Sequence, residues 1–351
     1  MCTHVREKSE LKRRGANFEM KHLLATCERI GVREFGGFGQ GVVALRDVKA
    51  GDTLLKVPLE KWYPMSAGNA YDTYNLSRPD FCERLIQYSK KLDTPVIGKP
   101  LFVGSVLMMV QLLDLVDNSV GDVRDHVDSI PRNIDVPIFW PSLDSVRGLP
   151  IERAILEQRQ LILSTYSNVV EPEFEHISAP KFAWAWTVLL SRAISNSKEQ
   201  MPFSIAPVLD FFNHESNRSA PGFCHHWFDH QKKEFVVSAL NDVEADSQLF
   251  ISYGALNNAD LLRLYGFCLE DNRDDYVAIQ MDTRSSIRCT QQGVEFNGMR
   301  DPDMTDSHIL FQLEKTLAFY STNWNHEENY VHKLISGETD ILKNCISKYK
   351  R

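Results

Sequence analysis

The sequence predicts a mixed α+β protein in which two groups of short strands are separated by a helical segment. Near residues 39–58 and again near residues 223–253, β-branched and aromatic runs alternate with turn residues, which is typical of short strands. Between these groups, from Trp62 to about Lys181, apolar residues recur at helical spacing. We therefore expect small sheets interrupted by an all-helical insertion.

The N-terminal region is expected to begin with a short amphipathic helix over residues 18–30, ended by Gly31. A glycine-rich stretch then leads into a β-branched run over residues 39–45, and residues 53–58 form a second candidate strand. We expect the two runs to pair as a β-hairpin with a glycine loop at its mouth. That loop is either a tight turn or a backbone surface that lies against a ligand, because glycine has no Cβ to hold a ligand off.

Helical spacing predicts helices in the insertion at residues 80–92, 101–115 and 150–169. The apolar run at 101–116 is shorter than the roughly 20 residues that span a bilayer, so we expect a buried helix. Three prolines in residues 129–141 predict an extended connector. After the insertion, residues 182–194 form a strongly apolar candidate helix.

The second strand group begins with a predicted hairpin, residues 223–228 with 234–240, and continues with a strand at 247–253. A helix at residues 258–265 is expected to stop at Gly266. The remaining expectations are a last strand at 276–281, a helix at 307–320 and a candidate helix at 339–350.

Composition and charge favour an intracellular globular protein. The 351 residues carry a formal net charge of -8, whereas nucleic-acid-binding domains usually have a basic excess, so we expect no nucleic-acid partner. Seven scattered cysteines without a Cys-x-x-Cys pair indicate reduced thiols. We expect no membrane segment, and a location in the cytoplasm or nucleus.

Two kinds of site are disfavoured. Cys224, His225, His226 and His230 are metal ligands by residue type, but the adjacent His225 and His226 would point to opposite faces of a strand. We therefore predict no metal site. A serine hydrolase is disfavoured because the chain has no Gly-x-Ser-x-Gly elbow.

Two blocks of polar residues on apolar stems remain as candidate sites. The first holds Asp210, Asn213 and His214 on a predicted turn, and the second holds Tyr253, Asn258, Tyr265 and Gly266. They are either ligand-binding groups or structural ones, namely an Asn-capped turn with a satisfied histidine and core tyrosines with bonded hydroxyls. Composition and spacing do not decide between these interpretations.

Five motifs in order along the chain carry a family resemblance. They are Gly39-Gln-Gly-Val-Val-Ala with Arg46-Asp-Val, Ile130-Pro with Pro137-x-x-Trp, Ser191-Arg192-Ala193, Asp210-x-x-Asn-His, and Tyr253-Gly with Asn258-Ala and Tyr265-Gly-Phe. From Gly37 to about Met281 the chain resembles the SET-domain protein methyltransferases, in particular the branch of the Rubisco large-subunit lysine methyltransferase.

The resemblance implies a SET fold of small β-sheets in which the Asn-His and Tyr-Gly segments form a pseudoknot, with a short C-terminal helical region. It implies S-adenosylmethionine as cofactor. The cofactor-binding residues carried over are Phe38, Gly39, Gln40, Arg192, Asn213, His214 and Tyr253. Tyr253 is the catalytic residue carried over, and the substrate-binding residues are Arg192, Asp210, Tyr253 and Tyr265. The family commonly has a glutamate where this chain has Phe38, so only backbone contacts carry over there, and Asn196 stands where the model enzyme has a second arginine.

The domain boundaries expected from the resemblance place a helix and the first part of the SET core at 1–62, the helical insertion at 63–181, the second part of the core at 182–285 and a C-terminal helical region at 286–351.

The expected function is protein-lysine N-methyltransferase with a protein substrate. Two alternatives stay open: a protein-histidine N-methyltransferase, and a SET module that binds partners without catalysis. A metal-dependent hydrolase ranks below both.

Overall fold

The computed structural model describes residues 27–36, 39–59, 65–92, 99–195, 203–281, 285–297, 304–322 and 330–350. The chain divides into two compact units. The first contains the described residues of Met1–Asn133 and Ser164–Ile251, and the second contains those of Ile134–Leu163 and Ser252–Arg351. Most of the helix predicted at 18–30 lies outside the described residues.

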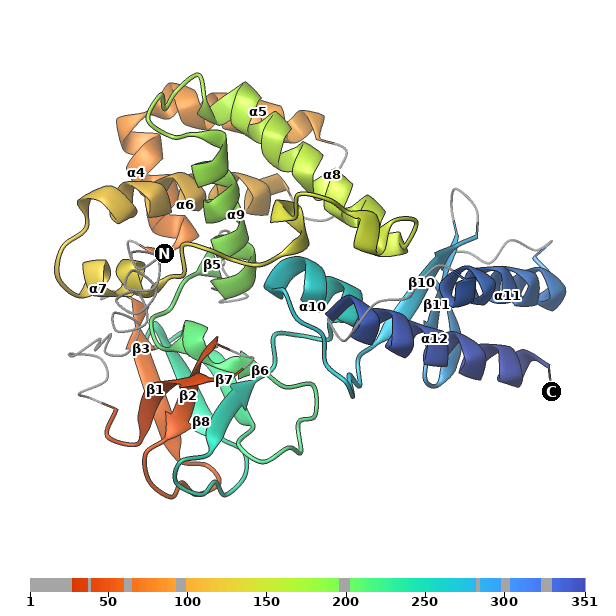
Figure 1. The fold of residues 1–351 in the computed structure, drawn as a ribbon. Coiled ribbons are helices and arrows are strands. Elements are labelled where there is room, and N and C mark those ends of the chain that lie inside the picture. The colour runs from red at the N-terminus through yellow and green to blue at the C-terminus, as the bar shows by residue number, and fades with distance from the viewer. Residues whose placement is uncertain are drawn as a thin grey trace, which may run out of the picture. The chain divides into compact units, whose positions relative to one another are not determined.

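The strands of the first unit form three small sheets (Figure 1). The first has the order β1 (Ile30–Phe35), β2 (Gly39–Ala44), β9 (Gln248–Ile251), β6 (Asn213–His214). The second has the order β3 (Thr53–Pro58), β8 (Glu234–Ala239), β7 (Cys224–Asp229), and the third pairs β4 (Ile194–Ser195) with β5 (Phe203–Ser204). β7 and β8 form the hairpin predicted from the sequence.

The predicted hairpin between β2 and β3 is wrong. β2 pairs with β1 and, through Val42↔Leu249, with β9, whereas β3 pairs with β8. The segment between β2 and β3 does not reverse tightly, because it runs beside residues 239–247 and bridges to them at Val48↔Val243. β2 therefore pairs with the strand before it and with a distant one, whereas β3 finds its partner far along the chain.

β6 consists only of Asn213 and His214, and it lies parallel to β9. Asn213 is level with Phe250, and His214 with Ile251. This pairing brings the Asn-His segment beside the strand that leads into Tyr253, as expected for the SET fold.

The helices of the first unit gather at one end of it, above the two larger sheets (Figure 1). They are α4 (Ala67–Ser77), α5 (Pro79–Lys91), α6 (Lys99–Asn118), α7 (Gly121–Ser129) and α9 (Ala179–Arg192). The predictions at 80–92, 101–115 and 182–194 are confirmed to within a few residues. α6 is long and apolar enough to span a membrane, but 67% of the window Leu101–Asn118 is buried, and it packs against α4, α5, α7 and α9. Its apolar character is that of a core helix.

The second unit joins helices to a three-stranded antiparallel sheet. Its elements are α8 (Pro150–Thr165), α10 (Asn258–Tyr265), β10 (Tyr276–Gln280), β11 (Ser286–Thr290), β12 (Gly293–Asn297), α11 (Asp306–Thr322) and α12 (Tyr330–Tyr349). The last two residues of α8 belong to the first unit. The last predicted strand corresponds to β10, so the sequence analysis missed β11 and β12. β11 buries only Ile287 and Cys289 on its inward face, which is too short an apolar pattern to stand out.

Two further details of the second unit differ from the predictions. α12 begins at Tyr330 rather than residue 339. Gly337 lies inside this helix, where a Cβ would come 3.2 Å from Asp275 Oδ2. The proline-rich connector contains a 3-10 turn at Pro137–Phe139. Arg159 holds this turn by donating to the backbone oxygens of Pro137, Ile138 and Trp140 at 2.6–2.9 Å.

Candidate functional site

Asn213 links β6 to β2 within the first unit. Its Nδ2 donates a hydrogen bond to the backbone oxygen of Gln40 at 3.3 Å. The neighbouring His214 is buried, with 4% of its surface exposed. Gln40 and Asn213, which the sequence placed at a cofactor site by resemblance, are thus in direct contact.

Gly41 provides the space for this contact. A Cβ at this position would lie 2.7 Å from Asn213 Nδ2 and 2.7 Å from Gln248 Nε2, closer than real Cβ atoms come to other heavy atoms. Only glycine therefore allows the Asn213 amide to approach β2 in this arrangement. Gly39, also predicted to bind the cofactor, has a positive φ of 69°, and no atom of the part of the chain that the structure describes lies within 4 Å of its Cβ position.

Asp210 lies on a strained 3-10 turn that precedes β6. The turn spans Leu209–Phe211, and the residue before it, Val208, has φ 66°, which is rare for a β-branched side chain. Val208 and Leu209 are fully buried, so packing holds the turn in place. The Asp210 side chain has 0% of its surface exposed.

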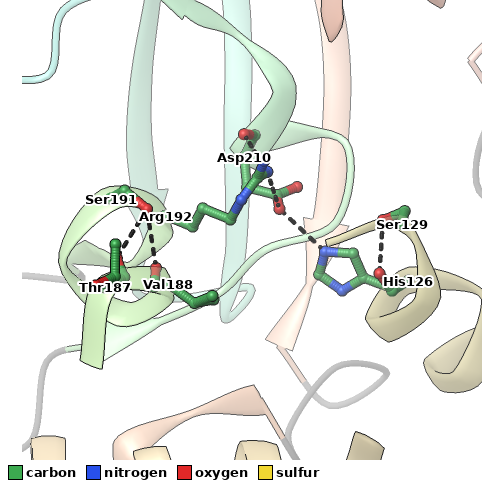
Figure 2. A network of polar contacts seen from close by, with 7 residues as sticks. All are labelled: His126, Ser129, Thr187, Val188, Ser191, Arg192 and Asp210. Carbon is green, nitrogen blue, oxygen red and sulfur yellow. Dashed lines mark hydrogen bonds and ion pairs between the residues drawn. The ribbon is translucent and has the colours of Figure 1, made fainter. Parts of the chain in front are cut away.

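Two basic side chains meet the buried carboxylate, as Figure 2 shows. Arg192, the last residue of α9, donates from Nη1 to Asp210 Oδ2 at 3.0 Å and to the Asp210 backbone oxygen at 3.1 Å. His126 of α7 places Nε2 3.2 Å from the same Oδ2, and its side chain is also 0% exposed. The predicted residues Arg192 and Asp210 are therefore together, and His126 joins them.

The charges around Asp210 decide its ionisation. Burial alone would raise the pKa of this carboxyl, but His126 and Arg192 outweigh burial and lower the pKa below its ordinary value. Asp210 is consequently a carboxylate near neutral pH. Its second oxygen, Oδ1, is buried and has no hydrogen-bond partner among the described residues.

Gln248 lies at the start of β9. Like Asp210 Oδ1, its Nε2 atom is buried and has no hydrogen-bond partner among the described residues. Unpaired buried donors and acceptors are costly, and in native proteins they are often completed by water or a ligand. The neighbourhood of Asn213 therefore has the polar capacity to hold a ligand with both donor and acceptor groups.

In the second unit, Tyr253 and Tyr265 form an aromatic pair. Tyr253 follows β9 closely, Tyr265 ends α10, and their ring centroids are 4.8 Å apart at an interplanar angle of 30°. Burial, followed by the negative charge of Asp260, raises the pKa of Tyr265 to about 12. The Tyr265 hydroxyl therefore stays protonated near neutral pH.

Asn258 has a structural role in the second unit. Its side-chain Nδ2 donates to Asp275 Oδ2 and to the Leu269 backbone oxygen, both at 3.0 Å, and its Oδ1 accepts from Leu269 N at 3.0 Å. Gly266 ends α10 in the left-handed conformation, with φ 82°. A Cβ there would meet the Asp135 backbone oxygen at 2.1 Å, so glycine is required where α10 meets the proline-rich connector.

Some predicted residues were not placed, and some were missed. Phe38 and Asn196 lie outside the described residues. His126 and Gln248 were not predicted: His126 lies in a short polar helix without a motif, and the only signal for Gln248 is a polar residue at the start of an apolar strand. Among the described residues no group of three or more His, Cys, Asp and Glu side chains is arranged to hold a metal ion.

The fold resembles two solved structures. Rubisco LSMT bound to AdoMet superposes with a TM-score of 0.62 at 13% sequence identity, covering 92% of this chain and 87% of that chain. The SET domain of LSMT bound to lysine and AdoHcy gives a TM-score of 0.64 at 12% identity, covering 92% and 86%. The likeness shows that this chain has the SET fold.

Two curated relatives are similar to this chain in sequence. The actin-histidine N-methyltransferase of Danio rerio is 23% identical over 285 residues, 75% of this chain and 43% of that protein. The Rubisco large-subunit N-methyltransferase of Nicotiana tabacum is 24% identical over 302 residues, 80% of this chain and 57% of that protein. The chain thus spans about half the length of these relatives. The family model of the SET domain matches residues 39–254, more than half of the chain, and the protein belongs to the SET-domain family.

Proposed function

We propose that this protein is a protein N-methyltransferase that takes a methyl group from S-adenosylmethionine and transfers it to a lysine side chain of a protein substrate. The observation that carries the proposal is the contact between Asn213 and the Gln40 backbone over Gly41. It lies inside the part of the chain that matches the SET domain.

The residues of the first unit fit the proposed cofactor. S-adenosylmethionine, when bound, supplies a methyl group on a cationic sulfonium and carries ammonium, carboxylate and adenine groups. Asn213, His214, Arg192 and the backbone of Gly39 and Gln40 would hold it. The buried atoms Asp210 Oδ1 and Gln248 Nε2, which lack partners among the described residues, support a polar ligand in this region.

The chemistry requires a neutral amine as nucleophile. An unperturbed lysine has a pKa of about 10.4, so neutralising it at pH 7 costs about 4.6 kcal/mol. An apolar channel reduces this cost because burial disfavours the charged form. Holding the amine and the methyl group in line contributes more, about 7–11 kcal/mol, so positioning matters more than a dedicated base.

Tyr253 and Tyr265 are the side chains proposed to shape this channel. The Tyr253 hydroxyl would orient the amine. The paired rings offer aromatic faces that attract a cationic group and restrict the space around it. Because Tyr265 remains protonated, it adds no negative charge that would favour the ammonium form of the target.

Histidine is the second candidate target. One observation favours it: a relative that matches 75% of this chain is an actin-histidine N-methyltransferase. An imidazole with a pKa of about 6.5 is mostly neutral at pH 7 and needs no deprotonation before it attacks. The aromatic pair does not by itself discriminate between the two targets.

The test combines binding with product analysis. Isothermal titration with S-adenosylmethionine should give a saturable site, and incubation of the protein with methyl-labelled cofactor and cell proteins should label a substrate. Hydrolysis of the labelled protein should then yield methyl-lysine. Methyl-histidine would move the proposal to the second candidate. Cofactor binding without transfer to any protein, or no binding at all, would favour a non-catalytic SET module.

A further inference from the structure

A cationic pocket lies in the helical part of the first unit, outside the candidate site. Its volume is about 530 Å³. Leu113 and Val116 at the end of α6 contribute apolar surface, and Trp184 of α9 adds an aromatic side chain. Arg124 of α7, Arg132 after α7 and Lys181 at the start of α9 bring three positive charges to the same pocket. Asp117 also lines the pocket, so its positive charges are in excess but not alone.

The cations are held in place and remain accessible. The Arg132 guanidinium lies 5.0 Å from the centroid of the Trp184 ring, and the Trp184 Nε1 donates to the backbone oxygen of Pro131 at 2.9 Å. Arg124 donates to Asp128 at 2.7 Å and to the Val116 backbone oxygen at 3.0 Å. The arginine side chains are nevertheless 46% and 42% exposed. Neighbouring groups therefore orient both guanidinium groups without covering them.

The charges favour carboxylates over a compact dianion. Lys181 has Asp117 at 4.0 Å, and both arginines have Asp128 within 3.6 Å, so the excess of positive charge is small and spread over three elements. A phosphate dianion is best bound by several donors that converge on one point. Spread cations beside Leu113, Val116 and Trp184 instead suit acidic side chains, which carry a charge on a short apolar stem.

We propose that this pocket binds an acidic segment of the protein substrate. The inference rests on the proposed function, because it takes the ligand to be a protein that is methylated. An acidic segment would otherwise be repelled by the negative net charge of the chain, and the pocket offers it local attraction. The acidic residues would contact Arg124, Arg132 and Lys181 in exchange for water.

The pocket and the candidate cofactor residues share two helices. Trp184 and Arg192 both lie on α9, about 12 Å apart along its axis at about 1.5 Å per residue. α7 carries Arg124 towards the pocket and His126 towards Asp210. An extended peptide advances about 3.3–3.6 Å per residue, so about four residues cover the axial distance. The pocket and Arg192 are thus close enough along α9 for one short extended segment to reach both.

The first test measures binding directly and needs no catalysis. A fluorescein-labelled glutamate-rich peptide is titrated with the full chain, and fluorescence anisotropy gives Kd. We expect the double variant Arg124→Gln, Arg132→Gln to bind about tenfold more weakly, and added salt to weaken wild-type binding. The matched control is Arg153→Gln, an arginine of α8 that is 82% exposed and paired with Glu157, which should leave Kd unchanged. Circular dichroism confirms folding of each variant.

The outcomes separate this inference from the proposed function. Equal Kd values for wild type and the double variant would overturn the proposal that the pocket binds an acidic segment. So would displacement of the peptide by millimolar inorganic phosphate at constant ionic strength, because that would identify a small-anion site. If the double variant binds the peptide more weakly but the protein transfers no methyl group, the acidic-peptide pocket is supported and only the proposed function is overturned. If methyl transfer does occur, the double variant should raise KM for an acidic substrate peptide about tenfold without lowering kcat, and an unchanged KM would count against the pocket.

Discussion

His126 and Asp210 are joined across the first unit by a 3.2 Å contact in which neither side chain has any exposed surface. His126 belongs to the segment predicted as a helical insertion, and Asp210 lies on the turn just before Asn213. The contact therefore ties the insertion to the turn that positions the proposed cofactor residues. Arg192 completes the pairing of the carboxylate from α9.

Replacing His126 by leucine should lower the free energy of unfolding by roughly 1.5–3 kcal/mol, because the buried Asp210 carboxylate loses one of its two side-chain hydrogen-bond partners. Urea unfolding measures the change. The matched control is His176→Leu, which removes a histidine that is 58% exposed and lies 3.7 Å from Asp114. An exposed pair of this kind contributes little, so the control should stay within about 0.5 kcal/mol of wild type. Equal effects of the two substitutions would contradict the role given to His126.

Gly41→Ala should weaken S-adenosylmethionine binding about tenfold or more, because the new Cβ would come within 2.7 Å of Asn213 Nδ2 and displace that amide. Isothermal titration checks the change. Gly31→Ala, on β1, is the control: the three described atoms nearest to its Cβ all belong to the partly exposed Leu45 side chain, the first at 3.1 Å. Unchanged affinity of Gly41→Ala would show that the cofactor does not depend on Asn213 at this place.

Tyr253→Phe should reduce kcat about a hundredfold while leaving cofactor affinity close to wild type, because the lost hydroxyl orients the attacking amine rather than the donor. Single-turnover transfer assays and titration with S-adenosylmethionine measure the two quantities. Tyr276→Phe, on β10, serves as a control for loss of a tyrosine hydroxyl elsewhere in the second unit and should keep wild-type kcat. Wild-type turnover by Tyr253→Phe would remove the catalytic role from this residue.

Glu338 should make stability depend on pH. It lies buried on α12, where it accepts a hydrogen bond from the Tyr320 hydroxyl of α11, and burial raises its pKa to about 8. A carboxyl whose pKa is higher in the folded state binds its proton more tightly there. Its contribution is fully present below the unfolded value of about 4.3 and is lost as pH rises towards 8.

The Glu338→Gln variant should therefore have a flatter profile of stability against pH between about pH 5 and pH 8, and should be more stable than wild type at the upper end by on the order of a few kcal/mol. Thermal unfolding in a series of buffers measures this. Glu314→Gln on α11, whose carboxylate is 47% exposed and bonded to Lys350, should keep the wild-type profile. A wild-type slope in Glu338→Gln would place the titrating group elsewhere.

Local signals in the sequence predicted α5, α6, α9 and α10 to within a few residues but missed α4 and α7. α10 was predicted at its observed bounds with Gly266 as its end, and the structure shows this glycine in the left-handed conformation. Asn257, which caps the first turn of α10, was not used in that prediction. α6 was predicted as a buried helix from its apolar run. In each case the interactions that define the element lie within one turn of the chain.

Strand pairing and the buried polar network could not be predicted in this way. β2 and β3 were paired with each other because they are neighbours in sequence, whereas β2 lies between β1 and the distant β9, and β3 pairs with the distant β8. His126 has no motif around it, and its importance follows from the Asp210 carboxylate that it meets in space. Arg192, Asp210 and Asn213 were identified through a family resemblance, since spacing alone left structural roles open.

The pairing of β3 with β8 also bears on how the chain is made. A ribosome synthesises β3 before the whole helical insertion, and β8 follows only after it. Until Glu234–Ala239 has emerged, the nascent β3 is without the neighbour it has in the finished sheet, and exposed strand edges of this kind promote association between chains. Once β8 has been translated, the newly made protein can cover the edge of β3 with its own strand.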